Sequence, residues 1–375
     1  MGDKICCKMK NIKSHIILVC LFVSMAACAA GPEPLTYKGE ILPQTHDWLR
    51  GECGKVGSAL KLPEISGIAC SRVTPGYIWM QSDNYEDRII ATDKKGETLY
   101  CRVNFTKKIR WDWEDMSGGV YEGKNYLFIG AFGDNDEDDS NYHIVWFEEP
   151  AIDPDNKVIS ITPNDIHFQY PEGKLHNCEA LMYDNREQML YIITKVYYNV
   201  CQVFSLPFRT DYGDELQTLT YVCDLGVKSD LGAGANPYKG FHLVTAADVS
   251  PDGKYILIKN HNNIVAKYSW ILLWTREGDE SVAETVTNRT PVVLDCYEYE
   301  WQGEAICWLD STTFYTTSDS DGEPPIFIYK KRKSTDVEDV STDKVDTKSL
   351  VMINNVMYIR GRDGLYTLDG RKMAK

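Results

Sequence analysis

The stretch Asn177-Cys178-Glu179-Ala180-Leu181 opens a short apolar strand with polar residues, and the strand that follows it ends in Thr194-Lys195. In an antiparallel hairpin, the start of the first strand lies beside the end of the second strand. We therefore expect the amide of Asn177, the carboxylate of Glu179 and the ammonium of Lys195 to meet at one edge of a sheet.

The same arrangement recurs along the chain, which makes five copies in all. The other openings are Glu64-Ile-Ser-Gly67, Trp113-Glu-Asp-Met116, Thr245-Ala-Ala-Asp-Val249 and Gly303-Glu-Ala-Ile306, and the matching strand ends are Ser82-Asp-Asn84, Gly133-Asp-Asn135, Lys259-Asn260 and Ser318-Asp319. Runs of β-branched and aromatic residues bounded by Gly, Asp, Asn and Pro occur throughout, whereas helical periodicity is scarce. The pattern is typical of an all-β chain.

The strands fall into groups of four, which predicts a β-propeller with five countable four-stranded blades. The last group has only three strands, and we expect the N-terminal segment at residues 35–41 to supply the fourth and close the ring. A sixth blade remains possible within residues 43–62 or 224–241. Ring closure would gather the polar edges of all blades around one central opening, which we call the mouth.

The N-terminus has the features of an export signal over residues 1–28. Several lysines precede an apolar run at residues 16–23, and small residues follow it. Met25-Ala-Ala-Cys28 resembles a bacterial lipobox, which predicts lipidation of Cys28, although Ala27-Cys-Ala29 could serve as an ordinary signal-peptidase site. We expect an exported protein of the cell envelope, in the periplasm or on the outer membrane or cell surface, with no membrane contact except this lipid.

The rest of the chain divides into a propeller at residues 29–333, a polar linker at 334–349 and a small β tail at 350–375. Turn-forming pairs such as Asp363-Gly364 predict a β-meander in the tail. The tail resembles the short C-terminal segments of many exported proteins of Bacteroides-type bacteria, some of which act as sorting signals. The alternative is a small accessory β-module.

Composition limits the classes of partner. The formal net charge of −15 repels phosphate backbones, which argues against nucleic acid and leaves cations and neutral or basic ligands. Among the cysteines after Cys28, no two have the CxxC spacing of a structural zinc site, and a Cys53–Cys70 disulfide is left open. We expect a small molecule or a glycan as the ligand.

The residues at the mouth suggest two kinds of chemistry. Oxygen ligands from several blades would suit Ca²⁺, and we expect them to be Glu64, Asn135, Asn177 and Glu179. In a hydrolase, a base would activate water while a cation stabilises the developing anion. The candidate bases are Asp115, Glu304 and His242, and the candidate cations are Lys195 and Lys259.

Several motifs resemble those of a widespread group of exported bacterial proteins that are predicted to be β-propellers. The motifs are Leu62-Pro-Glu-Ile-Ser-Gly-Ile68, Ser82-Asp-Asn84, Asp112-Trp-Glu-Asp115, Gly133-Asp-Asn135, Glu148-Glu-Pro150, Asn177-Cys-Glu-Ala-Leu181 and Gln302-Gly-Glu-Ala-Ile306. The resemblance spans roughly residues 60–330, and it implies no particular activity. More distantly, the chain is similar to calcium-dependent lactonase and phosphotriesterase propellers and to the esterase-like phytase group, through acids that open inner strands.

Two functions follow as hypotheses. One is a Ca²⁺-dependent hydrolase of esters, lactones or phosphoesters, with a glycosidase as a variant that needs only two suitably spaced carboxylates. The other is a propeller without catalytic activity that binds a glycan or a protein at the cell surface. In that case Trp111, Trp113 and Tyr238 would stack on sugar rings.

Overall fold

Strands make up nearly all of the regular structure. The computed structural model describes residues 34–84, 87–108, 112–196, 199–229, 242–262, 268–294, 297–298, 300, 302–319, 322–332, 349–353, 356–361 and 364–366. The chain divides into two units, residues 1–330 and 331–375, and each is described by itself.

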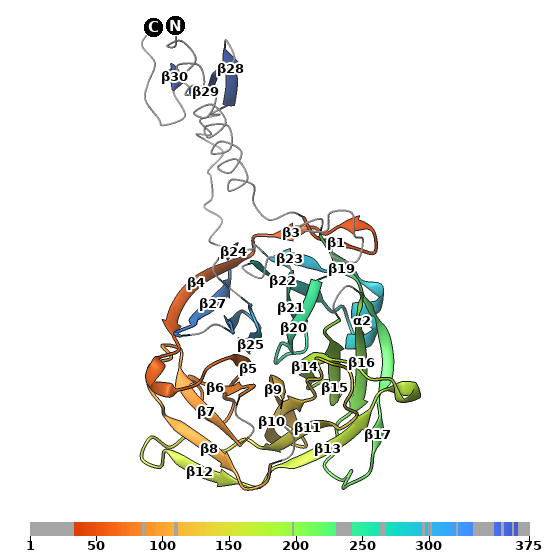
Figure 1. Ribbon diagram of the computed structural model, residues 1–375. Coiled ribbons are helices and arrows are strands. Elements are labelled where there is room, and N and C mark those ends of the chain that lie inside the picture. The colour runs from red at the N-terminus through yellow and green to blue at the C-terminus, as the bar shows by residue number, and fades with distance from the viewer. Residues whose placement is uncertain are drawn as a thin grey trace, which may run out of the picture. The chain divides into compact units, whose positions relative to one another are not determined.

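Five mainly antiparallel sheets of the first unit surround a central axis as the blades of a β-propeller (Figure 1). Their inner strands are β5 (Ile65–Cys70), β9 (Trp113–Tyr121), β14 (Cys178–Asp184), β20 (His242–Val249) and β25 (Ala305–Asp310). Each inner strand contacts the next in this order, and β25 contacts β5. The prediction of an all-β propeller with five blades is confirmed.

The remaining strands extend each blade outward. The first blade adds β6 (Tyr77–Ser82), β7 (Arg88–Asp93), β8 (Cys101–Phe105) and β12 (Val158–Ile161); the second adds β10 (Lys124–Ala131), β11 (Tyr142–Glu148), β13 (Asn164–Gln169) and β17 (Gln217–Thr218). The third adds β15 (Met189–Thr194), β16 (Cys201–Pro207) and β18 (Thr220–Leu225). The fourth adds β21 (Tyr255–Asn262), β22 (Tyr268–Thr275), β23 (Val292–Leu294), β3 (Gln44–Thr45) and β24 (Tyr297–Glu298), and the fifth adds β26 (Thr313–Thr317), β27 (Pro325–Lys331) and β4 (Trp48–Lys55).

The fourth strand of the fifth blade is β4, and the prediction that residues 35–41 supply it is wrong. Those residues form β1 (Thr36–Tyr37) and β2 (Glu40–Ile41), a short hairpin that pairs with β19 (Val227–Lys228). The hairpin turns at Lys38 and Gly39, which have φ angles of 51° and 83°. Two-residue strands are too short to cover β27, whereas β4 has eight residues and buries Trp48 in the core.

The hydrophobic core lies between neighbouring blades. One cluster joins the first and second blades through Trp79, Trp113 and Phe147, and comparable clusters fill each of the other junctions. The described residues include three short helices outside the blades: η1 (Ser58–Leu60), η2 (Pro171–Gly173) and α2 (Val282–Asn288). A capping box between Ser281 and Glu284 starts α2, and Val282 and Val286 on this helix are buried.

Two buried carboxylates tie the inner strands together near the axis. Asp115 on β9 accepts hydrogen bonds from the backbone N–H groups of Met116 (2.8 Å), Leu181 on β14 (3.0 Å) and Ala247 on β20 (3.0 Å). Asp248 on β20 likewise accepts from the backbone N–H of Trp308 on β25, at 2.8 Å. The inner strands β9, β14, β20 and β25 therefore share a hydrogen-bonded hub.

The second unit contains a three-stranded antiparallel sheet of β28 (Ser349–Ile353), β29 (Val356–Gly361) and β30 (Gly364–Tyr366), which is the predicted meander. The export signal with Cys28 and most of the polar linker lie outside the described residues. Within the described ranges, no helix is long and apolar enough to cross a membrane. Cys53 and Cys70 are both free thiols.

Candidate functional site at the mouth of the propeller

The strand openings and strand ends meet as predicted. Backbone N–H groups at the ends donate to carbonyls at the openings in four blades. The pairs are Asp83 to Glu64 (3.3 Å), Gly133 to Asp112 (3.2 Å), Lys195 to Asn177 (3.0 Å) and Asp319 to Gln302 (2.9 Å). In the fourth blade, β20 and β21 pair from His242 opposite Asn262 onward. The mouth is the end of the propeller axis where these residues gather.

A β-bulge interrupts the pairing of the innermost hairpin near the mouth in four blades. The residues at the bulges are Ser66 in the first blade, Glu114 and Asp115 in the second, Glu179 in the third and Thr245 in the fourth. A bulge re-aims a side chain and twists the strand locally, and bulges are common beside active sites. The repeated openings in the sequence therefore mark a repeated irregularity that delivers polar side chains to the mouth.

The backbone at the mouth is strained in the same way in three blades. Glu64, Asp112 and Gln302 each precede an inner strand and have φ angles of 50°, 68° and 43°. Such left-handed conformations cost residues other than glycine free energy, and they gather at functional sites. Gly133 faces this region, and a Cβ atom there would lie 2.2 Å from Oε1 of Glu114 and 2.5 Å from Oδ2 of Asp112. The Gly-Asp-Asn motif thus needs its glycine because two carboxyl groups occupy that space.

Lys195 is the cation at the centre of this acidic group. Its Nζ lies 3.1 Å from Oε1 of Glu179 and 4.0 Å from Oε1 of Glu304, and all three side chains are about nine-tenths buried. His261 also lies near Glu304, with Nε2 at 3.8 Å from the same carboxylate oxygen. One ammonium therefore faces carboxylates from two blades.

The surroundings raise the pKa values of two carboxyl groups near Lys195. Burial, the charge of Glu179 and a hydrogen bond to its side chain raise the pKa of Glu114 well above its usual range. Two carboxyl groups can share a hydrogen bond only when one is protonated. Burial likewise raises the pKa of Glu304 to about 7, against the opposing effect of Lys195. The mouth thus combines an acid with a raised pKa, a carboxyl group that titrates near neutrality and a cation.

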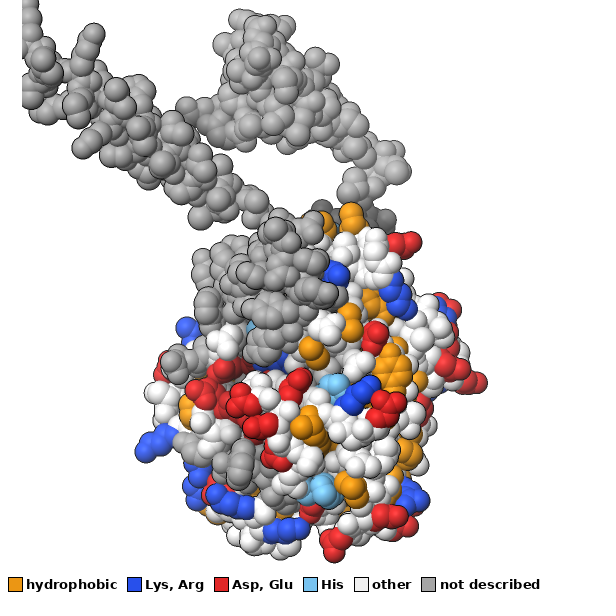
Figure 2. Space-filling model, turned by 45° about the vertical axis from the view of Figure 1, so that its right-hand side comes forward, with side chains coloured by type: hydrophobic (Ala, Val, Ile, Leu, Met, Phe, Trp, Pro, Cys, Tyr) orange, Lys and Arg blue, Asp and Glu red, His pale blue; other side chains and the backbone are white. Residues whose placement is uncertain are grey.

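A second group of acids lies on the side of the first and fifth blades. Burial and the charges of Glu64 and Asp319 raise the pKa of Asp83 to about 8. The Glu64 carboxylate accepts a hydrogen bond from the side-chain amide of Asn84. Acidic side chains gather visibly on one face of the propeller in Figure 2. As these acids ionise with rising pH, the mouth comes to repel anions.

The four expected Ca²⁺ ligands are only partly brought together. The side-chain nitrogen of Asn177 lies 3.1 Å from Oδ1 of Asn135 and 3.3 Å from Oε1 of Glu179, so these three residues form a chain. Glu64 instead bonds Asn84. The Asn177 amide and the Lys195 ammonium donate to the oxygens that would face a cation, and no group of three or more His, Cys, Asp and Glu in the described residues could hold a metal ion. These residues do not fit a preformed Ca²⁺ cage, and the role of Ca²⁺ stays a prediction.

The predicted catalytic residues occupy different environments. Lys195 and Glu304 lie together at the mouth, whereas Asp115 is fully buried in the hub with its oxygens on backbone N–H groups. Burial lowers the pKa of His242 to about 4, and its ring nitrogens bond Oδ1 of Asn260 (2.6 Å) and Oγ of Ser229 (3.0 Å).

Lys259 is fully buried and holds a structural position. It donates to the Glu300 carboxylate at 2.5 Å and to the Thr317 carbonyl at 3.1 Å. Gly303 leaves room for this lysine, because a Cβ atom there would lie 2.4 Å from Cε of Lys259. The sequence did not predict Glu300 as the partner of Lys259, because no motif distinguishes this residue.

The sequence did not predict a role for Glu114 by itself. The signal was nevertheless present, because Glu114 has the same place in the Trp113-Glu-Asp-Met116 opening as Glu179 has in the opening of the next blade. Trp113 is buried against Phe105, with ring centroids 5.6 Å apart, and so is not exposed for stacking on a sugar. Trp111 and Tyr238 lie outside the described residues.

The similarities of this chain to known proteins lie among solved structures. No family model matches the chain, and no curated protein matches its sequence. Among solved structures, it is similar to the β-propeller domain of Cps50 (Swd1) from Myceliophteria thermophila, with 12% identity, a TM-score of 0.33, and coverage of 80% of this chain and 96% of that one. The periplasmic gluconolactonase of Pseudomonas aeruginosa has 11% identity and a TM-score of 0.33, with 77% and 78% covered. A putative 6-phosphogluconolactonase from Bacteroides uniformis has 10% identity and a TM-score of 0.33, with 82% and 81% covered.

Proposed function

We propose that the protein is a hydrolase of the cell envelope that cleaves neutral esters or lactones at the mouth of the propeller. The observation that carries this proposal is the grouping of Lys195, Glu179, Glu114 and Glu304. Paired titratable groups whose pKa values are pushed apart by their surroundings are typical of acid and base residues in enzymes.

The reaction follows from the charges of these groups. The ionised form of Glu304 takes a proton from water, and the hydroxide attacks the carbonyl carbon. The ammonium of Lys195 stabilises the oxyanion that forms. The carbon–oxygen bond then breaks, and the proton shared by Glu114 and Glu179 passes to the departing alkoxide. Water supplies the hydroxyl group of the acid product. The proton that Glu304 takes from water then replaces the one that the Glu114–Glu179 pair has lost.

The charge of the mouth selects among the substrates considered. Above about pH 8, where both Asp83 and Glu304 are ionised, the acids at the mouth repel a phosphoester unless a metal ion bridges it. Neutral esters and lactones carry no such penalty. Calcium would have to displace the Lys195 ammonium from Glu179 or bind on the side of Glu64.

Hydrolysis assays test the proposal. Wild-type protein should hydrolyse at least one member of a panel of γ- and δ-lactones and short-chain p-nitrophenyl esters. Glu304→Gln should lower kcat/KM by about 100-fold or more, within the range typical of a general base. Glu148→Gln is the matched control, because Glu148 pairs with Lys124 on the exposed surface. Full activity of Glu304→Gln would contradict the assignment.

A parallel melting experiment tests calcium. The midpoint of unfolding should rise with added Ca²⁺ and fall with a chelator if Ca²⁺ binds the folded protein. A midpoint that changes with neither Ca²⁺ nor the chelator would mean that the folded protein binds no Ca²⁺ at the Lys195 site. If the panel gives no turnover at all, the binding function for a glycan or partner protein replaces the hydrolase.

The location in the cell is part of the proposal. Export directed by residues 1–28, lipidation of Cys28 and a sorting role for the C-terminal sheet rest on sequence patterns alone. Mass spectrometry of the protein from a membrane fraction checks the anchor: a diacylglyceryl group on Cys28 is expected, and an unmodified N-terminus after Ala27 or Ala29 contradicts it.

A further inference from the structure

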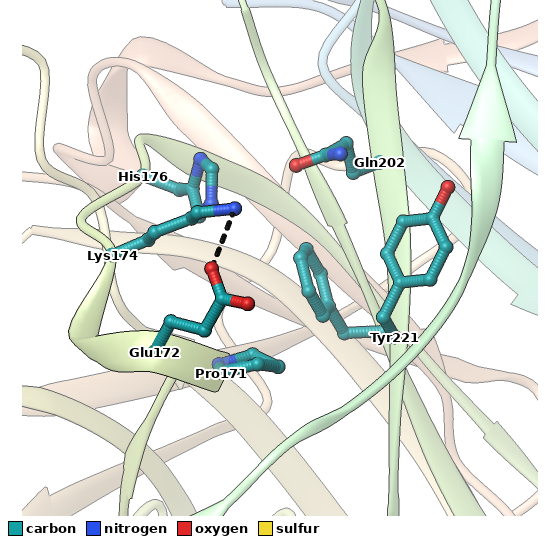
Figure 3. A pocket seen from close by; sticks show the side chains of 7 residues that line it. Pro171, Glu172, Lys174, His176, Gln202 and Tyr221 are labelled. Atoms are coloured by element: carbon teal, nitrogen blue, oxygen red, sulfur yellow. Dashed lines mark ion pairs between the residues drawn. The ribbon is translucent and has the colours of Figure 1, made fainter.

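A separate pocket lies between the outer strands of the third blade and the segment that connects the second blade to the third. It has a volume of about 340 Å³ and is lined by η2 and by side chains of β16 and β18 (Figure 3). This volume is at the lower end of the range of roughly 300–1,000 Å³ found for small-molecule sites. His176 lines the pocket, and the next residue, Asn177, belongs to the mouth.

One wall of the pocket is aromatic. Phe204 is buried and Tyr221 is 47% exposed, with their ring centroids 5.8 Å apart in an edge-to-face arrangement. The Tyr221 hydroxyl donates to Oδ1 of Asp224 at 2.9 Å, which holds this exposed ring in place. A fixed aromatic face with a polar end is a surface for the apolar face of a ring-shaped ligand.

Polar groups beside and across from the aromatic wall have fixed orientations. Gln202 donates its side-chain N–H to Oδ1 of Asp224 at 3.1 Å, so its amide oxygen is directed toward the side where His176 lies (Figure 3). Burial lowers the pKa of His176, so its ring is neutral and offers one donor and one acceptor. No hydrogen bond to this ring is found from the described residues, and its edge-to-face contact with Tyr170 fixes its plane.

The pocket carries no net charge, unlike the mouth. Its charged residues, Glu172 and Lys174, form an ion pair at 3.2 Å on the exposed rim. An aromatic wall, a neutral imidazole and an amide oxygen together match a ligand with one apolar face and several hydroxyl groups. We propose that this pocket binds a pyranose ring of a neutral saccharide, with the ring stacked on Tyr221 and its hydroxyls bonded to Gln202 and His176.

Calorimetric titration of the full-length protein with maltotriose, cellotriose, mannotriose and xylotriose tests the proposal. At least one of these should bind with a Kd in the millimolar range or tighter. Tyr221→Ala and Gln202→Leu should each weaken that affinity at least tenfold. Gln217→Leu is the matched control, because the Gln217 amide bonds only the neighbouring Glu215 carbonyl, at 2.9 Å, on the exposed surface.

The outcome is independent of the hydrolase proposal. Glu304→Gln should leave saccharide affinity unchanged, since Glu304 does not line the pocket. Unfolding curves of each variant show whether an altered affinity reflects lost structure. No binding of any trisaccharide to the wild type, or equal affinity of folded Tyr221→Ala and Gln202→Leu, would overturn the inference.

Discussion

The ammonium of Lys195 lies 3.1 Å from the carboxylate of Glu179. Glu179 is near the start of the first strand of a hairpin and Lys195 follows the end of its second strand, and these two positions lie side by side. Glu179 is the extra residue of the bulge in β14, and Lys195 directly follows β15. The bulge and the strand end thus form an ion pair. Its lysine also lies near Glu304, so it links an acid of the third blade to an acid of the fifth blade.

Replacing Lys195 tests this ion pair. Lys195→Met leaves Glu179 without its buried cation, and breaking a buried pair by removing one partner typically costs about 3–5 kcal/mol. We expect a lower free energy of unfolding in urea at pH 8, together with loss of hydrolysis. Lys124→Met removes an exposed ion pair and should leave the urea midpoint unchanged. Equal midpoints for the two variants would contradict a buried pair at the mouth.

The hub predicts that Asp115 acts through stability. Asp115→Ala leaves the N–H groups of Met116, Leu181 and Ala247 without acceptors, and each orphaned buried donor costs about 1–3 kcal/mol. The free energy of unfolding should therefore fall by at least about 3 kcal/mol. Asp153→Ala removes one exposed hydrogen bond, from the Asp155 N–H, and should change it by at most about 1 kcal/mol. A stable Asp115→Ala protein that lacks activity would instead make Asp115 the base.

Glu304 predicts the direction of the pH dependence of stability. Its pKa in the folded protein is about 7, above the ordinary value of 4.5, so folding favours the protonated form. The contribution of Glu304 to the free energy of unfolding is highest below pH 4.5 and falls as pH rises toward 7, by about 3 kcal/mol at most. Glu304→Gln should thus unfold at a higher temperature than the wild type at pH 8 and at the same temperature at pH 4. A stabilisation of equal size at both pH values would contradict this origin.

Gly133 tests how the acids are packed. In Gly133→Ala the new Cβ would meet Oε1 of Glu114, so the carboxyl group must move and its hydrogen bond to Glu179 weakens. We expect kcat/KM to fall about tenfold or more, since misplacing a catalytic group by 1 Å can cost roughly 100-fold. Gly51→Ala, where the nearest side chain is an ordinary 3.7 Å away, should leave activity unchanged. Unaltered activity of Gly133→Ala would place Glu114 outside the reaction.

The sequence predicted the blades and the meeting of Glu179 with Lys195, because both follow from local strand pairing. It did not predict β4 as an outer strand, since Gly51 and Gly54 interrupt its alternation and its partner β27 lies more than 250 residues away. The sequence also did not predict that Lys259 and Asp115 are fully buried. A strand pattern shows which residues lie near the axis. It does not show whether a charged side chain is solvated, bonds backbone N–H groups as Asp115 does, or pairs with a buried residue such as Glu300.

The pH profile of kcat/KM tests the central claim, that Glu304 is the base of a hydrolytic site at the mouth, most directly. For the ester or lactone that the wild type turns over, kcat/KM should rise with pH and level off above an apparent pKa of about 7, as Glu304 ionises. The residual activity of Glu304→Gln should lack this ionisation. A wild-type profile that is flat between pH 5 and 9, or the same ionisation in Glu304→Gln, would contradict the account.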